Sequence, residues 1–232
     1  MAQKSPPLHT STRQAISQIF QQLDYAALAP IYCDEGGEAF WNAHRGPCER
    51  LGAKLARQIK TQLLPQGKSL YVGAGVAEIP IMIMEMFELN RHIEAYNLRT
   101  EEVALLNQTC QAHGLDFQAA DAQEAIGIFN HMWIVSVLND PERFPELSAL
   151  SYGRANPAIF DIPQFQQERD TVFTLTDQCL KKLSIPGLVT TSVEEIPWIS
   201  AWCEHQNLSY SIGDEDYPTA IVKDPICFIH VG

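Results

Sequence analysis

Two glycines in the run Val72-Gly73-Ala74-Gly75-Val76 have the spacing that points most directly to chemistry. They follow an apolar run and precede a segment with helical periodicity. Glycine permits a tight turn and lets the backbone approach a ligand closely. The first turn of the following helix offers unpaired N–H groups to a polar ligand group. The pattern predicts a ligand-binding turn, with a purely structural turn as the alternative, because a lone Gly-x-Gly is a weak signal.

Two polar residues follow the next two predicted strands. Asn97 ends a strand predicted at 93–98, about two dozen residues past Gly73, in the region where nucleotide-binding sheets place a carboxylate that contacts ribose. Asp121 follows a strand predicted at 116–120. Because ligands of open α/β sheets bind at the carboxyl ends of the strands, both residues are candidates for the same site. Asp121 could equally cap the helical turn that starts at Ala122.

Strands and helices alternate from Ser69 onward, which predicts a parallel sheet covered on both faces. A short acidic turn near the C-terminus predicts an antiparallel hairpin at the end of the sheet. Residues 31–47 are expected to be irregular, and they and the proline-containing segment 141–169 are expected to close over a substrate. The other expected strands are 69–72, 132–138, 188–193, 208–212 and 226–231, and the expected helices are 12–29, 51–63, 78–89, 101–112, 170–183 and 199–206.

Composition and charge narrow the class of protein. The chain has 232 residues and a formal net charge of −12, which disfavours a nucleic-acid partner. The basic cluster Lys54, Arg57 and Lys60 is explained by a solvated helix face. The six cysteines have neither C-x-x-C nor zinc-finger spacing, so we expect reduced thiols and no metal. No secretory signal or membrane-spanning run is visible, which favours a cytoplasmic protein without a membrane partner; a homodimer is left open.

The run 70–75, the strand ending at Asn97, the segment 114–122 and the strand at 132–138 together resemble the motifs of class I S-adenosylmethionine-dependent methyltransferases. The resemblance covers about residues 50–232 and implies an α/β, Rossmann-like fold. Its seven-stranded, mostly parallel sheet would have the order 3-2-1-4-5-7-6, with helices on both faces. Residues 1–49 would form an N-terminal helical cap, and residues 50–232 the methyltransferase-like domain.

The resemblance implies S-adenosylmethionine as the cofactor and methyl transfer to an O, N or S nucleophile of a small molecule. Gly73 and Gly75 would pass close to the methionine part, and Asn97 would meet the ribose hydroxyls. Asp121 would accept a hydrogen bond from the adenine amino group. The positions matched to cofactor contacts are Gly73, Ala74, Gly75, Asn97, Leu98, Asp121, Ala122, Val137 and Leu138.

Three positions depart from the family pattern. Tyr71 stands where the family has an acidic residue, Ala77 where it has a third glycine, and Asn97 where it has an acidic ribose contact. Glu78 could bind cofactor in place of the lost acidity, although a first-turn Glu is also favourable for the helix itself. The alternative function is therefore a catalytically inactive methyltransferase-like domain that binds a ligand or a protein.

Four side chains are candidates for catalysis. Tyr32 and His44 lie in segment 31–47, and His44 could act as a base toward a hydroxyl or thiol. Asn139 and Asp140 follow the strand at 132–138 and partly resemble the Asn/Asp-Pro-Pro-aromatic motif of amino methyltransferases. A structural loop is an equal alternative for the first pair, and a simple turn is favoured for the second. The catalytic residues stay open, because positioning and desolvation can suffice when the nucleophile is already free.

Overall fold

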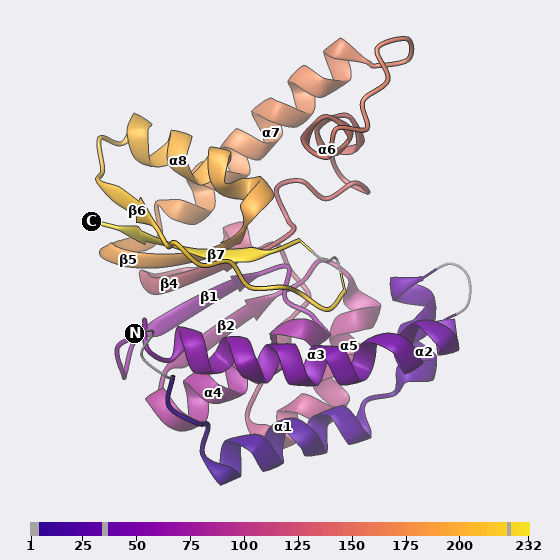
Figure 1. The fold of residues 1–232 in the computed structure, drawn as a ribbon, viewed down its shortest axis with the longest axis vertical. Helices are drawn as coiled ribbons and strands as arrows, with labels where there is room; N and C mark the ends of the chain where they lie inside the picture. Colours follow the sequence, from indigo (N-terminus) through magenta and orange to yellow (C-terminus); the bar gives the residue numbers. More distant parts are fainter. Residues whose placement is uncertain (1–4, 34–36, 222–223) are drawn as a thin grey trace. The chain divides into compact units, whose positions relative to one another are not determined.

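The computed structural model describes residues 5–33, 37–221 and 224–232. Its strands form a sheet with the order β3-β2-β1-β4-β5-β7-β6 (Figure 1). Strand β1 pairs parallel with β2, β2 with β3 and β4 with β5, whereas β7 pairs antiparallel with both β5 and β6. The predicted fold class and strand order are confirmed. The chain divides into two compact units, which we call the first unit (Met1–Ala125 with Tyr217–Lys223) and the second unit (Ile126–Asp216 with Asp224–Gly232).

The first unit contains three parallel strands, β1 (Lys68–Val72), β2 (His92–Tyr96) and β3 (Phe117–Gln118). After its first residue β1 is buried throughout, as expected for a strand covered on both faces. Helices α4 (Ile79–Leu89) and α5 (Thr100–Cys110) follow β1 and β2 closely to the predicted bounds. The strand predicted at 116–120 is only two residues long.

The N-terminal helices differ from the prediction. The helix expected at 12–29 is two helices, α1 (Thr10–Gln22) and α2 (Tyr25–Tyr32), because the Asp24 side chain caps α2 by accepting from the Ala27 N–H at 3.0 Å. Most of the segment predicted as irregular lies in α3 (Gly37–Ile59), while residues 34–36 lie outside the described residues. Helix α3 packs against α4 and α2 (Figure 1) and runs across the predicted domain boundary at 49, which stays a prediction.

A buried polar network explains the tyrosine that replaces the family's acidic residue. Tyr71 is fully buried, and its hydroxyl donates to Glu85 Oε1 at 2.6 Å. Arg91 Nε donates to Glu85 Oε2 at 2.9 Å, and the Ser69 hydroxyl also donates to that carboxylate. Each of these polar groups is paired, as burial requires. Tyr71 is therefore committed to the core between β1 and α4.

The second unit contains β4 (Phe129–Ile134), β5 (Leu183–Ser192), β6 (Tyr210–Ile212) and β7 (Ile226–Val231). The predicted closing hairpin is confirmed, since β6 and β7 pair antiparallel. Helix α7 (Ile162–Leu180) starts eight residues before its predicted start because Asp161 caps it, and α6 (Pro145–Ser151) and α8 (Ile196–His205) complete the unit. In Figure 1, α7 and α8 lie on one side of these strands.

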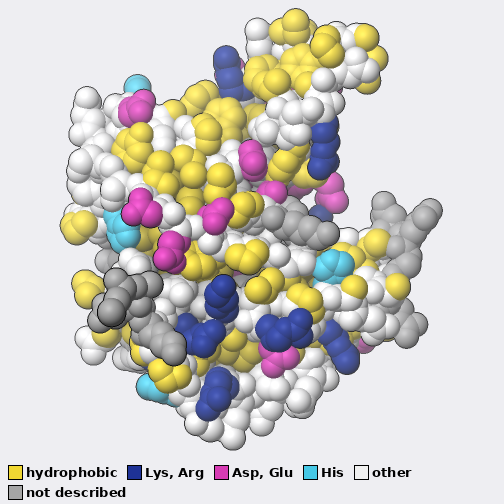
Figure 2. Space-filling view, viewed as in Figure 1, with side chains coloured by type: hydrophobic (Ala, Val, Ile, Leu, Met, Phe, Trp, Pro, Cys, Tyr) yellow, Lys and Arg dark blue, Asp and Glu magenta, His cyan; other side chains and the backbone are white. Residues whose placement is uncertain are grey.

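Surface charge and cysteines complete the description. Figure 2 shows Lys and Arg side chains gathered on part of one face, and the predicted basic residues Lys54 and Arg57 of α3 are exposed. Lys60 is bonded to Glu88 at 2.5 Å. None of the six cysteines forms a disulfide. Among the helices of the described ranges, none has the length and apolarity needed to cross a bilayer. The cytoplasmic location stays a prediction.

Candidate functional site

The glycine turn has the predicted strand-turn-helix geometry. Gly73 has φ of +70°, a left-handed conformation that glycine adopts without the steric cost of a side chain. The Ala74 N–H donates to the carbonyl oxygen of Tyr96 at 3.0 Å, and the Gly75 N–H donates to Glu78 Oε2 at 2.8 Å. The first bond ties the turn to the end of β2, and the second fixes the start of the following helix. The backbone of the turn is thus held from both sides.

Two polar neighbours leave no room for a side chain at Gly75. A Cβ at this position would lie 2.7 Å from both Glu102 Oε1 and the Tyr32 hydroxyl. Tyr32 is the last residue of α2, and Glu102 lies in the first turn of α5. The Tyr32 hydroxyl donates to Glu102 and accepts from the Val76 N–H at 3.3 Å. The structure therefore brings the predicted Tyr32 and Gly75 together around a carboxylate that was not predicted.

Asn97 also belongs to this cluster. Its Nδ2 donates to the Ala74 carbonyl at 2.8 Å and to Glu102 Oε2 at 3.1 Å. Its Oδ1 accepts from the Arg99 N–H at 2.8 Å. Every group of the amide is bonded within the protein, so Asn97 links the glycine turn to α5. Its proposed contact with ribose stays a prediction.

The two carboxylates beside the turn are electrostatically perturbed. Burial raises the pKa of Glu78 to about 7. The hydrogen bond from the Gly75 N–H lowers this pKa, and the nearby Glu102 raises it further. Burial also raises the pKa of Glu102, although the Tyr32 and Asn97 donors oppose it. Burial and the adjacent Glu102 raise the pKa of Tyr32 well above its usual value, so this hydroxyl keeps its proton. The Tyr32 hydroxyl is therefore a neutral donor that faces Glu102.

Asp121, Ala122 and Leu98 are the positions predicted to contact the adenine base of the cofactor. Asp121 Oδ1 accepts from the Gln123 N–H at 2.9 Å, and its Oδ2 accepts from Gln123 Nε2 at 2.9 Å. Asp121 therefore performs the capping role weighed as its alternative, for the turn Ala122–Glu124. Leu98 is 51% exposed, as single apolar side chains on a protein surface commonly are. The adenine contacts of Asp121, Ala122 and Leu98 stay predictions.

His44, the other candidate of segment 31–47, lies in α3 within an aromatic cluster. Its ring stacks on Phe40 with centroids 4.2 Å apart, and Nδ1 lies 2.7 Å from the Phe40 carbonyl oxygen. This contact favours the tautomer with hydrogen on Nδ1, which leaves Nε2 as an acceptor. Trp41, the anchor of the cluster, is buried and meets the Tyr32 ring edge-on at 4.8 Å.

In the second unit, β4 ends at Ile134, four residues before the predicted end. The cause is Glu195, a fully buried carboxylate that accepts from three consecutive N–H groups beyond the strand. The distances are 2.9 Å to Ser136, 2.6 Å to Val137 and 2.5 Å to Leu138. Burial raises the pKa of Glu195, and these donors oppose the rise. Val137 and Leu138 therefore lie in a fixed loop after β4, and their contact with cofactor stays a prediction.

Asn139 follows this loop and has an acceptor without a partner. It is 1% exposed, and its Nδ2 donates to the Tyr152 hydroxyl at 3.0 Å. Tyr152 in turn donates to Asp224. Oδ1 of Asn139 is buried and bonds to no group of the described residues. Asp140 instead accepts from the Glu142 N–H at 2.9 Å, which fits the turn favoured for it.

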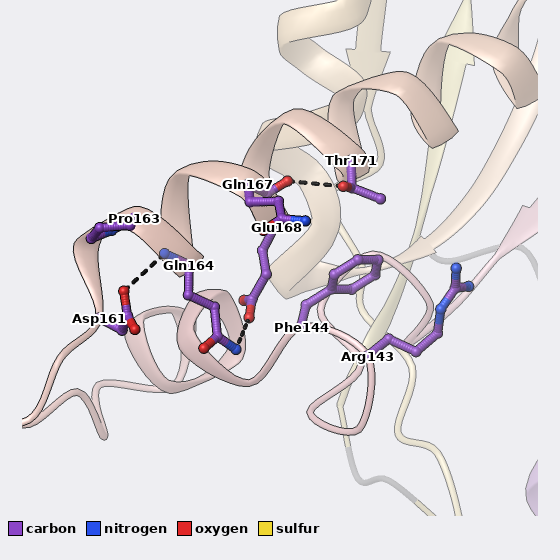
Figure 3. Close-up of a pocket in the computed structure, with 8 residues that line it drawn as sticks. All are labelled: Arg143, Phe144, Asp161, Pro163, Gln164, Gln167, Glu168 and Thr171. Atoms are coloured by element: carbon purple, nitrogen blue, oxygen red, sulfur yellow. Dashed lines mark hydrogen bonds between the residues drawn. The ribbon is translucent and has the colours of Figure 1, made fainter.

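An open groove of about 720 Å³ lies between the segment after β4 and α7 (Figure 3). Glu168 forms part of its wall, where it accepts from the Leu147 N–H at 2.9 Å and from Gln164 Nε2 at 2.9 Å. Arg143 lies over the Phe144 ring at 5.2 Å. The groove is thus built from residues of segment 141–169 and from the adjoining part of α7.

Sequence analysis missed three polar groups that organise these sites. Glu102 lies in the first turn of α5, where an acidic residue is favourable for the helix itself, so its sequence position gives no separate signal. Glu195 could have been found, because Ser192-Val193-Glu194-Glu195 matches the capping box Ser-x-x-Glu. The Tyr152–Asp224 pair has no local signal, since its members are 72 residues apart.

Comparison with known proteins supports the fold. No family model matches the chain, and no curated protein matches it. The structure of magnesium protoporphyrin IX methyltransferase from Synechocystis PCC 6803, with bound S-adenosylmethionine, is similar with a TM-score of 0.54, 11% identity and coverage of 95% of this chain and 97% of that chain. Precorrin-6y C5,15-methyltransferase from Geobacter metallireducens gives a TM-score of 0.47 at 10% identity over 78% of this chain and 87% of that chain. The chain therefore has the class I methyltransferase fold.

One prediction about partners is wrong. The tRNA m1G37 methyltransferase of M. jannaschii is also similar, with a TM-score of 0.46, 13% identity and coverage of 79% of this chain and 50% of that chain. That protein is named for a tRNA substrate. The net charge of −12 of the present chain does not exclude nucleic acid as a partner. Net charge describes the whole surface, whereas nucleic-acid binding depends on local patches.

Proposed function

We propose that this chain binds S-adenosylmethionine at the glycine turn and transfers its methyl group to an O, N or S nucleophile of a small molecule. The observation that carries the proposal is the glycine turn itself, in which Gly73 has φ of +70°. It follows the carboxyl end of β1, and ligands of open α/β sheets bind at that end. A cofactor bound to the magnesium protoporphyrin IX methyltransferase of the same fold supports the choice of ligand.

The residues present fit an adenosyl cofactor. Gly73, Ala74 and Gly75 would follow its methionine part, because glycine lets the backbone approach a ligand closely. The exposed side chain of Leu98 would offer an apolar surface to adenine. Asp121 and Ala122 would meet the polar edge of the base. The contact of Val137 with the cofactor stays a prediction, and Glu195 fixes the loop that contains Val137.

When bound, the cofactor supplies an electrophilic methyl group on a sulfonium. The chain's contribution is then to place the nucleophile in line and exclude water. Asn139 stays a predicted catalytic residue, and its unpartnered Oδ1 is able to accept a hydrogen bond from an O–H or N–H group. Tyr152 would hold the amide in that orientation by accepting from Nδ2. His44, with Nε2 as an acceptor, stays a predicted base, and the catalytic role of Asp140 stays a prediction.

A small-molecule acceptor is supported by two observations. The groove of about 720 Å³ in the second unit falls in the size range of small-molecule pockets. The neighbour that matches this chain over nearly its whole length is named for magnesium protoporphyrin IX.

Methyl transfer is tested with S-adenosylmethionine carrying a radiolabelled methyl group. The protein is incubated with a small-molecule extract and, separately, with a tRNA pool. We expect label in the small-molecule fraction and none with a Gly75→Ala variant. Label in tRNA would contradict the proposed acceptor class, and no label in either pool would contradict catalysis on these substrates.

A second candidate function is a ligand-binding or partner-binding domain without catalysis. Two observations favour it. The Tyr32 hydroxyl lies against Gly75, and the side-chain amide of Asn97 is already hydrogen-bonded within the protein. Calorimetry with S-adenosylmethionine and S-adenosylhomocysteine separates the two functions. If neither ligand binds at millimolar concentration, the proposed enzymatic function is refuted.

A further inference from the structure

Glu102 is a buried carboxylate whose hydrogen bonds come from neutral donors, while the nearby Arg99 charge lowers its pKa against the effect of burial. It is 2% exposed, and its donors are the Tyr32 hydroxyl and Asn97 Nδ2. Within the described residues no lysine or arginine side chain donates to it. A carboxylate has about four acceptor positions, and a buried one is costly unless they are hydrogen-bonded. Glu102 can therefore accept further hydrogen bonds from a neutral donor at the face of Gly75.

The Tyr32 hydroxyl shows which kind of group fits at this position. It donates to the carboxylate of Glu102 and accepts from the Val76 N–H at 3.3 Å. A sugar hydroxyl can make the same two bonds, since it is also both donor and acceptor. Two neighbouring hydroxyls, as in ribose, suit a carboxylate with two oxygens. A basic or purely accepting ligand group would not reproduce this pattern.

Tyr32 is supplied by a separate element, which makes an exchange possible. It is the last residue of the eight-residue helix α2, whereas Gly75, Val76 and Glu102 belong to the sheet and its following helices. Its ring contacts Trp41 at 4.8 Å. Withdrawal of the hydroxyl would leave the turn and Glu102 in place, because Asn97 still links them.

We propose that Glu102 binds the ribose hydroxyls of the adenosyl cofactor, and that the Tyr32 hydroxyl holds this position until the cofactor displaces it. This inference rests on the proposed function, because it needs the cofactor to bind at the glycine turn. Asn97, at the position where a ribose contact was predicted, is instead a positioning residue that orients Glu102. The acidic ribose contact has moved from the end of β2 into the first turn of α5.

Calorimetry with the wild-type chain tests the ligand side. S-adenosylhomocysteine is compared with its 2′-deoxy and 3′-deoxy analogues. Because a hydrogen bond to a charged group is lost, we expect roughly 10- to 100-fold weaker binding of at least one analogue. Equal affinities for all three ligands would overturn the inference and leave the proposed function intact. No binding of S-adenosylhomocysteine itself would refute both.

Three variants test the protein side. Glu102→Gln should bind S-adenosylhomocysteine roughly 10-fold or more weakly and should lose most of its discrimination against the deoxy analogues. Glu101→Gln, an exposed neighbour in the same helical turn, should match wild type. Tyr32→Phe, which removes the competing hydroxyl, should bind several-fold more tightly. Full discrimination in Glu102→Gln, or weaker binding by Tyr32→Phe, would overturn the assignment. If Glu102→Gln does not fold, the comparison of the deoxy analogues on the wild-type chain still tests the assignment.

Discussion

Gly75→Ala gives a sharp test of the packing at the glycine turn. Gly75 has φ of −138°, outside the left-handed region that favours glycine, so we assign the cost of the variant to the new methyl group. The methyl carbon would lie 2.7 Å from Glu102 Oε1 and from the Tyr32 hydroxyl. Both atoms must move by about 0.7 Å to reach an ordinary contact of 3.4 Å. Glu102 is held by Asn97 and Tyr32 is packed on Trp41, so neither moves freely.

Overpacking of this kind costs about 1–3 kcal/mol. For a chain of this length, that loss lowers Tm by roughly 2 to 12 °C. Urea and thermal unfolding of wild type and Gly75→Ala measure it. The matched control is Gly46→Ala in α3, whose Cβ would meet only the flexible end of Arg50 at 3.0 Å. It should be neutral or stabilising by up to about 1 kcal/mol, because alanine favours a helix.

A double-mutant cycle identifies the contact responsible. Gly75→Ala combined with Tyr32→Phe should be less destabilised than the sum of the single variants, by about 0.5 kcal/mol or more, because one of the two collisions is removed. Strict additivity would refute the geometry at Gly75. A Gly75→Ala variant as stable as wild type would refute it as well.

Three further outcomes follow from the carboxylates. Because the pKa of Glu78 is raised to about 7 in the folded state, the folded chain holds this proton more tightly, and the free energy of unfolding should fall as pH rises from about 4.5 to 7. Glu78→Gln should remove up to about 3 kcal/mol of that fall in urea titrations across pH, and an unchanged slope would contradict the assigned pKa. Glu195→Ala should lower the free energy of unfolding, measured with urea, by about 3–5 kcal/mol, because the N–H groups of the loop at Val137 lose their acceptor. The control variant Glu194→Ala should lower it by under about 1 kcal/mol. Asp121→Ala should cost about 1 kcal/mol through the lost cap, and unchanged affinity for S-adenosylhomocysteine would disprove its contact with adenine.

The features that sequence predicted well are local. The glycine turn needs only an apolar strand, a glycine at positive φ and a helix start, all within a few residues of Gly73. The closing hairpin needs only two strands that follow one another along the chain, β6 and β7. Helix α2 was merged with α1 although Asp24 is a recognisable cap, so that signal was present and overlooked.

The features that sequence did not predict depend on contacts between distant segments. Glu102 receives its hydroxyl donor from Tyr32, 70 residues earlier. Glu195 ends β4 by bonding the N–H groups of a loop that begins 59 residues earlier, at Ser136. The sequence of one strand cannot show where a residue from a distant segment takes up the N–H groups that would otherwise continue the strand. Asn97 was predicted as a ribose contact for the same reason, since the use of its amide by Ala74 and Glu102 is visible only in the folded chain.

The central claim is that an adenosyl ligand binds at the glycine turn. The most direct measurement is a titration of the ¹⁵N-labelled chain with S-adenosylhomocysteine, followed by NMR of the assigned backbone amides. We predict saturable shifts concentrated at Gly75 and Val76, and their loss in Gly75→Ala. Absence of shifts at millimolar ligand, or shifts confined to residues away from the turn, would contradict the claim.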